Sequence, residues 1–241
     1  MTKADQKFIA QLKQKKYRTL HQAFIVEGWK SIGDFIKGGY TPFKIYAINP
    51  VENLWSSEIN IESVSPKQLK QISFLQHPKD ALAIFKPKNE MQLPQKGLVL
   101  ALDGLQDPGN LGTIIRTADW FGVQHIVCSK NTVDCYNPKV VQATMGALAH
   151  VHVSYTDLNQ FIQQTPLPVF GTFLQGANLF QTELPDQAVI VIGNEGNGIG
   201  KSISDLITHR ITIPKAPGAL AESLNASVAT AVVLGAFCLK P

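Results

Sequence analysis

The residues best placed for chemistry lie in the second half of the 241-residue chain, in three segments that each follow an apolar run. The first segment, residues 102–119, passes through Asp-Gly and Asp-Pro-Gly turns and then carries Asn110 and Arg116. We expect Asn110 to cap a helix, because its side-chain amide suits that position. Arg116 would lie in an otherwise apolar turn, where a guanidinium needs an anionic partner or an open cleft. The alternative is a structural ion pair with Asp103 or Asp119.

The second segment is the run Gly-Asn-Glu-Gly-Asn-Gly at 193–198, between an apolar strand and a helix. Its three glycines let the backbone approach a ligand closely. The spacing GxxGxG differs from the dinucleotide fingerprint GxGxxG, and no acidic residue follows where a ribose contact needs one. Glu195 would also repel a phosphate, which favours a ligand with hydroxyl or cationic groups. The segment therefore argues against a nicotinamide- or flavin-dependent oxidoreductase.

The third segment, residues 211–234, leaves a strand at Pro214, crosses a loop rich in proline and glycine, and opens a long apolar helix with Glu-Ser-Leu-Asn. Ser223 and Asn225 would lie near the start of that helix, where unpaired N–H groups and the positive end of the helix dipole are found. Ordinary capping would explain one of them. Two such residues after a glutamate exceed what capping needs, so a role in binding or catalysis is open to them.

Alternating strands and helices must position these segments. Several of the expected strands, such as 98–102 and 188–192, are unbroken apolar runs, as in parallel strands that are buried on both faces. We therefore predict an α/β fold with a doubly wound parallel sheet, whose ligands bind at the carboxyl ends of the strands. Further strands are expected at 125–129, 151–154, 168–173 and 210–213, and helices at 111–121, 138–148, 157–164, 199–208 and 222–238.

The first part of the chain predicts a smaller α/β unit. We expect a domain at 1–90, a polar linker at 91–96 and a second domain at 97–241. In the first domain, helices are expected at 5–20, 28–37 and 65–72, and strands at 23–27, 43–48 and 81–85.

Charge divides unevenly between the two parts. Residues 1–96 hold 15 Lys and Arg against 8 Asp and Glu, whereas residues 97–241 hold 7 against 10. The net positive charge of residues 1–96 would attract a polyanion such as a nucleic acid, although lysines also serve to keep a small domain soluble. Trp29, Trp55 and Trp120 could stack on bases, but we expect them to pack in the interior.

Composition excludes several classes of protein. Apolar residues make up 44% of the chain and charged residues 17%, which is typical of a globular protein. No run of eighteen apolar residues predicts a membrane span, and no apolar stretch near the start predicts a secretion signal, so we expect a cytoplasmic location. Cys128, Cys135 and Cys238 show no CxxC pair, and we expect them to be small buried side chains. His150 and His152 lack a third ligand, so we expect no metal.

The three segments together resemble the motifs of the SpoU (TrmH) family of RNA 2′-O-ribose methyltransferases. The motifs are Asp-Pro-x-Asn-x-Gly-x-x-x-Arg, Gly-Asn-Glu-Gly-x-Gly and Glu-Ser-Leu-Asn-x-Ser-Val-Ala, in this order over roughly residues 97–240. The front part is similar to that family's L30e/L7Ae-like substrate-binding domain, through Phe24-Ile-Val-Glu-Gly. Lys215 stands where a methionine is common, Ala226 stands where a valine is usual, and the loop between Pro214 and Glu222 is longer than usual.

The resemblance implies a fold, a cofactor and an assembly. The fold would carry a deep trefoil knot of the SPOUT type at its C-terminal end, an exception to the general absence of knots. The cofactor would be S-adenosylmethionine, and the chain would form a homodimer in which the helix bearing Arg116 lies near the partner's cofactor. The residues matching the family's cofactor contacts are Gly193, Ile213 and Leu224, with Thr172, Leu174, Asn194 and Gly198 also assigned to that site.

The resemblance also implies the reaction, in which a sulfonium methyl passes to a ribose 2′-hydroxyl. The hydroxyl is a weak acid, so catalysis must align its oxygen and stabilise the negative charge that develops on it. Arg116 is the candidate for that task, either as electrostatic stabiliser or as the general base that family accounts describe, although a guanidinium resists deprotonation. Asn110, Glu195, Ser223 and Asn225 would orient Arg116 and the ribose.

The substrate is expected to be RNA, with ribosomal RNA favoured over transfer RNA by the two-domain layout. The alternatives are a transfer RNA 2′-O-methyltransferase and a non-catalytic RNA-binding or ribosome-assembly protein on the same fold.

Overall fold

The computed structural model describes the chain except for residues 51–58, 79, 90–91 and 240–241. The chain separates into two compact units, each of which combines two separate stretches of the sequence. Unit 1 comprises Met1–Asn89 and Asp134–Ala149, and unit 2 comprises the remaining residues. The domain boundaries expected above stay a prediction.

Unit 1 is built on a four-stranded sheet in the order β1-β4-β2-β3. β1 and β2 run antiparallel to β4, and β3 runs parallel to β2. The strands are β1 (Phe24–Glu27), β2 (Pro42–Ala47), β3 (Ile61–Ser63) and β4 (Ala81–Phe85). The helices are α1 (Lys3–Gln11), α2 (Lys15–His21), α3 (Trp29–Lys37), α4 (Pro66–Ile72), α6 (Pro138–Thr144) and the 3₁₀ turn η1 (Ala147–Ala149).

The helix expected over 5–20 is two helices, and the side chain of Arg18 explains the break. Arg18 Nη1 donates hydrogen bonds of 2.9 Å to the carbonyl oxygens of both Leu12 and Lys13, which lie between α1 and α2. These carbonyl groups are thereby paired without a continuous helix. β3 was not predicted, because three residues are too few to show an alternating pattern.

The segment 134–149 joins unit 1 through a buried ion pair and an aromatic contact. Arg18 is 5% exposed, and its Nη2 lies 2.5 Å from Asp134 Oδ2. The rings of Phe24 and Tyr136 pack with their centroids 4.3 Å apart. The Tyr136 hydroxyl lies 3.5 Å from that of Tyr40, and burial raises the pKa of Tyr136.

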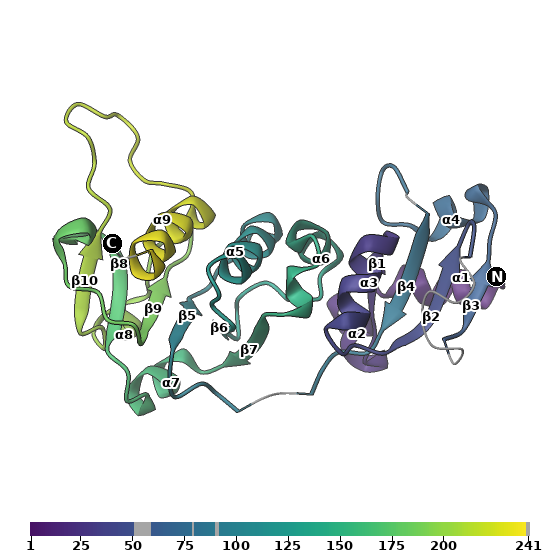
Figure 1. Ribbon diagram of the computed structural model, residues 1–241, viewed down its shortest axis with the longest axis horizontal. Helices are drawn as coiled ribbons and strands as arrows, with labels where there is room; N and C mark the ends of the chain where they lie inside the picture. Colours follow the sequence, from purple (N-terminus) through teal and green to yellow (C-terminus); the bar gives the residue numbers. More distant parts are fainter. Residues whose placement is uncertain (51–58, 79, 90–91, 240–241) are drawn as a thin grey trace. The chain divides into compact units, whose positions relative to one another are not determined.

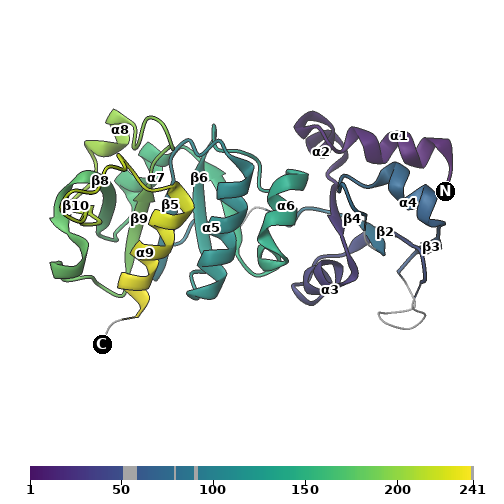
Figure 2. The same cartoon turned by 90° about the horizontal axis from the view of Figure 1, so that it is seen from above.

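Unit 2 is built on a six-stranded sheet that is fully parallel, as predicted. The strand order is β10-β8-β9-β5-β6-β7. Helices α5 and α9 lie side by side on one face, and α7 and α8 lie on the other (Figures 1 and 2). The strands are β5 (Leu98–Leu102), β6 (His125–Ser129), β7 (His152–Thr156), β8 (Val169–Asn178), β9 (Ala188–Ile192) and β10 (His209–Thr212). The helices are α5 (Pro108–Trp120), α7 (Leu158–Gln164), α8 (Lys201–Ser204), α9 (Ala226–Cys238) and the 3₁₀ turn η2 (Leu179–Gln181).

The core of this unit follows from the pleat of its strands. Val99, Ala101 and Val191 point to one face of the sheet and pack with Phe161 of α7 and Ile203 of α8. Residues alternating with these point to the opposite face, which α5 and α9 cover (Figure 1). Because both faces are covered, β5 and β9 are apolar throughout their lengths.

The structure corrects the expected starts of two helices. α5 begins at Pro108, and its N-cap is Asp107, whose Oδ1 accepts the N–H of Asn110 at 2.7 Å. The prediction that Asn110 caps the helix is therefore wrong, because proline at the first position begins the helix earlier. α9 begins at Ala226 rather than at residue 222, with Asn225 as its N-cap.

The expectation of buried tryptophans is wrong for Trp120, which is 85% exposed at the end of α5. Trp29 is half-buried, and Trp55 lies outside the described residues. Cys128 and Cys135 are buried as expected, and Cys238 is half-buried. Among the described helices, none has the length and apolar character needed to cross a membrane.

Candidate active site

A chain of side-chain hydrogen bonds joins all three motif segments at one end of α5. Asn110 Nδ2 donates to Glu195 Oε1 at 3.0 Å, and Asn225 Nδ2 donates to Asn110 Oδ1 at 2.9 Å. Asn225 Oδ1 in turn accepts the N–H of Ser227 at 2.9 Å and its hydroxyl at 2.7 Å. The structure thus brings together three of the five predicted catalytic residues.

Each amide in this chain has a defined orientation. The carboxylate of Glu195 can only accept, so Asn110 must turn its NH₂ toward it and its oxygen toward Asn225. Asn225 then uses its own oxygen to cap α9 and its NH₂ to reach Asn110. The cap of α9 and the glycine loop are consequently coupled through a single side chain of α5.

The glycine loop, residues 193–198, is fastened by Asn194. Its Nδ2 donates to the carbonyl oxygen of Gly104 at 2.7 Å, and its Oδ1 accepts the N–H groups of Gly196 and Asn197 at 2.9 and 3.0 Å. The backbones of Asn194 and Gly198 exchange two hydrogen bonds of 2.9 Å. The loop is therefore a closed turn, and Gly198 adopts a positive φ of 66° within it.

Of the other predicted cofactor residues, Thr172 and Leu174 lie within β8, and Ile213 and Leu224 come after β10. Thr172 Oγ1 donates to the carbonyl oxygen of Val191 at 3.2 Å, which ties β8 to β9 beside the glycine loop. Leu174 is 76% exposed and Leu224 is 49% exposed, although both are large and apolar. Ile213 is half-buried directly after β10. This end of the sheet therefore presents backbone polar groups together with uncovered apolar side chains.

Arg116 and Ser223 are not part of the hydrogen-bonded chain. Both are exposed, and neither forms a hydrogen bond or ion pair with another described residue. The structural ion pair considered for Arg116 is therefore not formed. Asp103 instead accepts the N–H of Gly200 through Oδ2 at 2.7 Å.

Sequence reasoning missed two residues that hold the site. Asp103 fixes the segment after the glycine loop, and Asp107 caps α5, so that the end of α5 stays in place for Asn110. The signal for Asp107 was the following Pro108, because proline favours the first position of a helix. The signal for Asp103 was its position directly after a buried strand.

In the described part of the chain, no group of three His, Cys, Asp or Glu residues is arranged to hold a metal ion. His150 is exposed at the surface. His152 instead packs near His125, with ring centroids 5.5 Å apart, and burial lowers the pKa of His125.

Comparison with known proteins identifies the class. Residues 97–235 match the model of the SpoU rRNA Methylase family, and residues 4–83 match that of an MRM3-like substrate binding domain. The first match covers more than half of the chain. The chain therefore belongs to the SpoU rRNA methylase family.

Relatives that are similar over the whole length support this assignment. The chain is 28% identical over 231 residues to RlmP, the 23S rRNA (guanosine(2553)-2′-O)-methyltransferase of Bacillus subtilis, covering 92% of this chain and 91% of that protein. A solved structure of a TrmH-family protein from Porphyromonas gingivalis is 35% identical, with a TM-score of 0.90 and 98% of each chain covered. The AdoMet-bound rRNA methyltransferase from Sinorhizobium meliloti is 27% identical, with a TM-score of 0.88 over 98% of this chain and 94% of that one.

Proposed function

We propose that the chain transfers a methyl group from S-adenosylmethionine to a ribose 2′-hydroxyl of RNA, with ribosomal RNA as the substrate. The observation that carries the proposal is the hydrogen-bonded chain from Glu195 through Asn110 to Asn225, which assembles all three family motifs in one place. The names of RlmP and of the AdoMet-bound neighbour support the reaction and the cofactor.

The exposed apolar side chains fit the proposed cofactor. Leu174 and Leu224 would cover an adenosine ring, which accounts for large apolar groups left open at this end of the sheet. Gly193, Asn194 and Gly198 would offer backbone groups, with Thr172 and Ile213 nearby. When bound, S-adenosylmethionine supplies a methyl group on a sulfonium that needs no further activation. We include in the proposal the trefoil knot that the family resemblance implies.

Arg116 acts on the attacking oxygen in this proposal. It is exposed and has no ion-pair partner among the described residues, so its charge is available to a substrate. A guanidinium held near the 2′-oxygen would stabilise the negative charge that develops during attack. Asn110 and Glu195 would hold the α5 end against the glycine loop, and Ser223 would contact the ribose.

Two measurements on one variant test the proposal. Arg116→Ala should abolish transfer of radiolabelled methyl to ribosomal RNA, while calorimetry shows nearly unchanged binding of S-adenosylhomocysteine. Equal loss of both would contradict the role of Arg116. A wild-type protein that binds RNA but transfers no methyl would support the non-catalytic alternative.

The RNA class is tested with substrates from a strain that lacks the gene. Its purified ribosomal RNA should accept methyl groups from the enzyme, and its transfer RNA should not. Acceptance by transfer RNA alone would favour the alternative substrate. We include a cytoplasmic location in the proposal.

We include a homodimer in the proposal, supported by the surface of α9. This helix holds no charged residue, and its outward-facing Val228 is 49% exposed. A helix that is apolar on all sides is normally buried, so a second copy would cover it. Val228→Glu should convert the dimer to a monomer in analytical ultracentrifugation, whereas a wild-type monomer would contradict this part of the proposal.

A further inference from the structure

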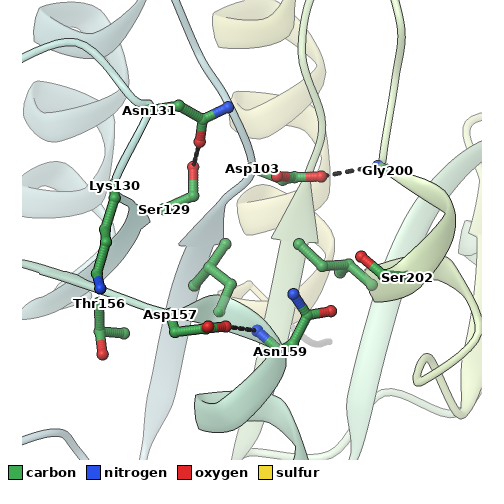
Figure 3. Close-up of a pocket in the computed structure, with 11 residues that line it drawn as sticks. Asp103, Ser129, Lys130, Asn131, Thr156, Asp157, Asn159, Gly200 and Ser202 are labelled. Atoms are coloured by element: carbon green, nitrogen blue, oxygen red, sulfur yellow. Dashed lines mark hydrogen bonds between the residues drawn. The ribbon is translucent and has the colours of Figure 1, made fainter.

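A pocket of about 230 Å³ opens at the carboxyl ends of β5, β6 and β7 (Figure 3). Glu195, Asn110 and Asn225 do not line it, so it is distinct from the hydrogen-bonded chain described above. A volume of this size holds far more than one water molecule, which needs about 10–15 Å³ on the same measure. The polar groups of its lining come from Asp103, Ser129, Lys130, Asn131, Thr156, Asp157, Asn159 and Ser202.

The walls of the pocket are fixed by hydrogen bonds. Ser129 is 8% exposed, and its Oγ accepts the N–H of Gly104 at 2.8 Å and donates to Asn131 Oδ1 at 2.5 Å. Asp157 Oδ1 accepts the N–H of Asn159 at 2.9 Å as the cap of α7. The side chains of Ser129, Asn131 and Asp157 are therefore held in place before a ligand arrives.

Several polar atoms of the lining are left for a ligand. In the part of the chain that the structure describes, no hydrogen bond engages Asp157 Oδ2, Asp103 Oδ1, Asn131 Nδ2 or Lys130 Nζ. The pocket thus offers carboxylate acceptors together with amide and ammonium donors. Its two carboxylates would repel a phosphate, which makes a neutral base the better occupant.

One residue connects this pocket to the glycine loop. The N–H of Gly104 donates to Ser129 in the pocket wall, and its carbonyl oxygen accepts from Asn194 in the loop at 2.7 Å. Gly200, which also lines the pocket, follows the glycine loop by two residues. A base in this pocket would therefore lie beside the glycine loop, whose backbone is proposed to contact the cofactor.

We propose that the pocket binds a guanine base of the RNA substrate, an inference that rests on the proposed function. The Watson–Crick edge of guanine carries two adjacent N–H donors and one carbonyl acceptor. The carboxylate of Asp157 accepts from the donors, and Lys130 or Asn131 donates to the carbonyl oxygen. Adenine lacks the carbonyl group, uracil has a single N–H donor, and cytosine has no ring N–H.

Binding of mononucleotides tests this assignment. With S-adenosylhomocysteine present at saturation, GMP should bind more tightly than IMP, AMP, CMP or UMP in calorimetry or ligand-observed NMR. Asp157→Asn should weaken GMP binding by about fivefold to about 150-fold, the range expected for one bidentate base contact. Asparagine is itself a good N-cap, so α7 should remain intact. Asp205→Asn makes the same chemical change outside the pocket and should leave GMP binding unaltered.

The outcomes separate this inference from the proposed function. If the wild-type protein binds S-adenosylhomocysteine and methylates RNA but binds the five nucleotides equally, or if Asp157→Asn binds GMP normally, the guanine pocket is wrong and the function stands. If the protein neither binds S-adenosylhomocysteine nor transfers methyl, the function fails, and the inference resting on it fails too. Selective GMP binding that Asp157→Asn alone removes, with methyl transfer by the wild type, supports both.

Discussion

The α-carbon of Gly193 faces the backbone of Gly198 so closely that a Cβ there would lie 2.2 Å from the Gly198 carbonyl carbon and 2.4 Å from the nitrogen of Ile199. Backbone atoms cannot yield as the end of a flexible side chain can. The closed glycine loop therefore depends on the absence of a side chain at this position.

Substitution of Gly193 should open the loop. Gly193→Ala is expected to weaken S-adenosylhomocysteine binding more than about tenfold, because displacing backbone here strains a site that must be held closely. Gly196→Ala is the matched control, since its Cβ would have Asn194 Oδ1 as nearest neighbour at 3.6 Å. Calorimetry on both variants, with circular dichroism to verify folding, gives the comparison. Equal affinities would show that the close contact does not matter.

Removing the donor at Asn110 should impair catalysis. Asn110→Asp cannot donate a hydrogen bond to Glu195. It also places a second carboxylate where the amide nitrogen now lies, 3.0 Å from Glu195 Oε1. Hydrogen bonds to charged groups contribute about 1.5–3 kcal/mol, so methyl transfer should fall about tenfold or more. Thr113→Ala, one turn further along the exposed side of α5, should retain activity. Full activity of the Asn110→Asp variant would contradict a role for the hydrogen-bonded chain in catalysis.

Loss of the ion pair in unit 1 should destabilise the protein. Arg18→Met leaves the carboxylate of Asp134, which is 14% exposed, without its partner. Breaking a buried pair in this way costs about 3–5 kcal/mol in free energy of unfolding. Urea denaturation measures the change, and Lys16→Met on the exposed side of α2 should have little effect. A similar small effect for both variants would show that Asp134 finds water or another donor.

The stability of unit 1 should depend on pH through Glu27. Burial raises the pKa of Glu27, against the opposing effect of hydrogen bonds from Ser73 Oγ and the Phe74 N–H. The folded chain therefore keeps this proton to a higher pH than the unfolded chain does. The stabilisation is complete below the ordinary pKa and is lost as pH rises through the raised one.

The matching variant is Glu27→Gln, which cannot ionise. Its free energy of unfolding should improve relative to that of the wild type as pH rises from acidic to neutral, as measured by urea denaturation at several pH values. Glu183→Gln replaces an exposed glutamate and should show no such trend. A constant difference between Glu27→Gln and the wild type would contradict the raised pKa.

Strands β5 and β9 could be predicted to the residue, because burial on both faces makes each of them an unbroken apolar run. The strands at 98–102, 125–129 and 188–192 have the bounds expected from the sequence. Helix starts were predicted less well, since Asp107 and Asn110 are both suitable caps and only Pro108, which favours the first position of a helix, distinguishes them in the sequence. The break before α2 depends on Arg18, whose bonds to two carbonyl groups have no pattern in the sequence.

For the candidate site, the sequence predicted which segments carry polar residues but not how those residues pair. Asn110, Glu195 and Asn225 meet because α5, the glycine loop and the start of α9 converge, and such pairing requires the folded sheet. The pocket containing Asp157 was not predicted. Its residues are spread over the ends of separate strands, and none of them forms a motif alone.

Because residues 134–149 belong to unit 1, this unit can be completed only late in the synthesis of the chain. When residue 89 has been made, unit 1 still lacks the segment that supplies Asp134 and α6. Completing the segment takes a further 60 residues, from 90 to 149. At about 5–20 residues per second, this is about 3–12 s of translation. Until Asp134, the first residue of the segment, has been added, the nascent chain holds Arg18 without its carboxylate, so a chaperone that shields this surface would act within that window.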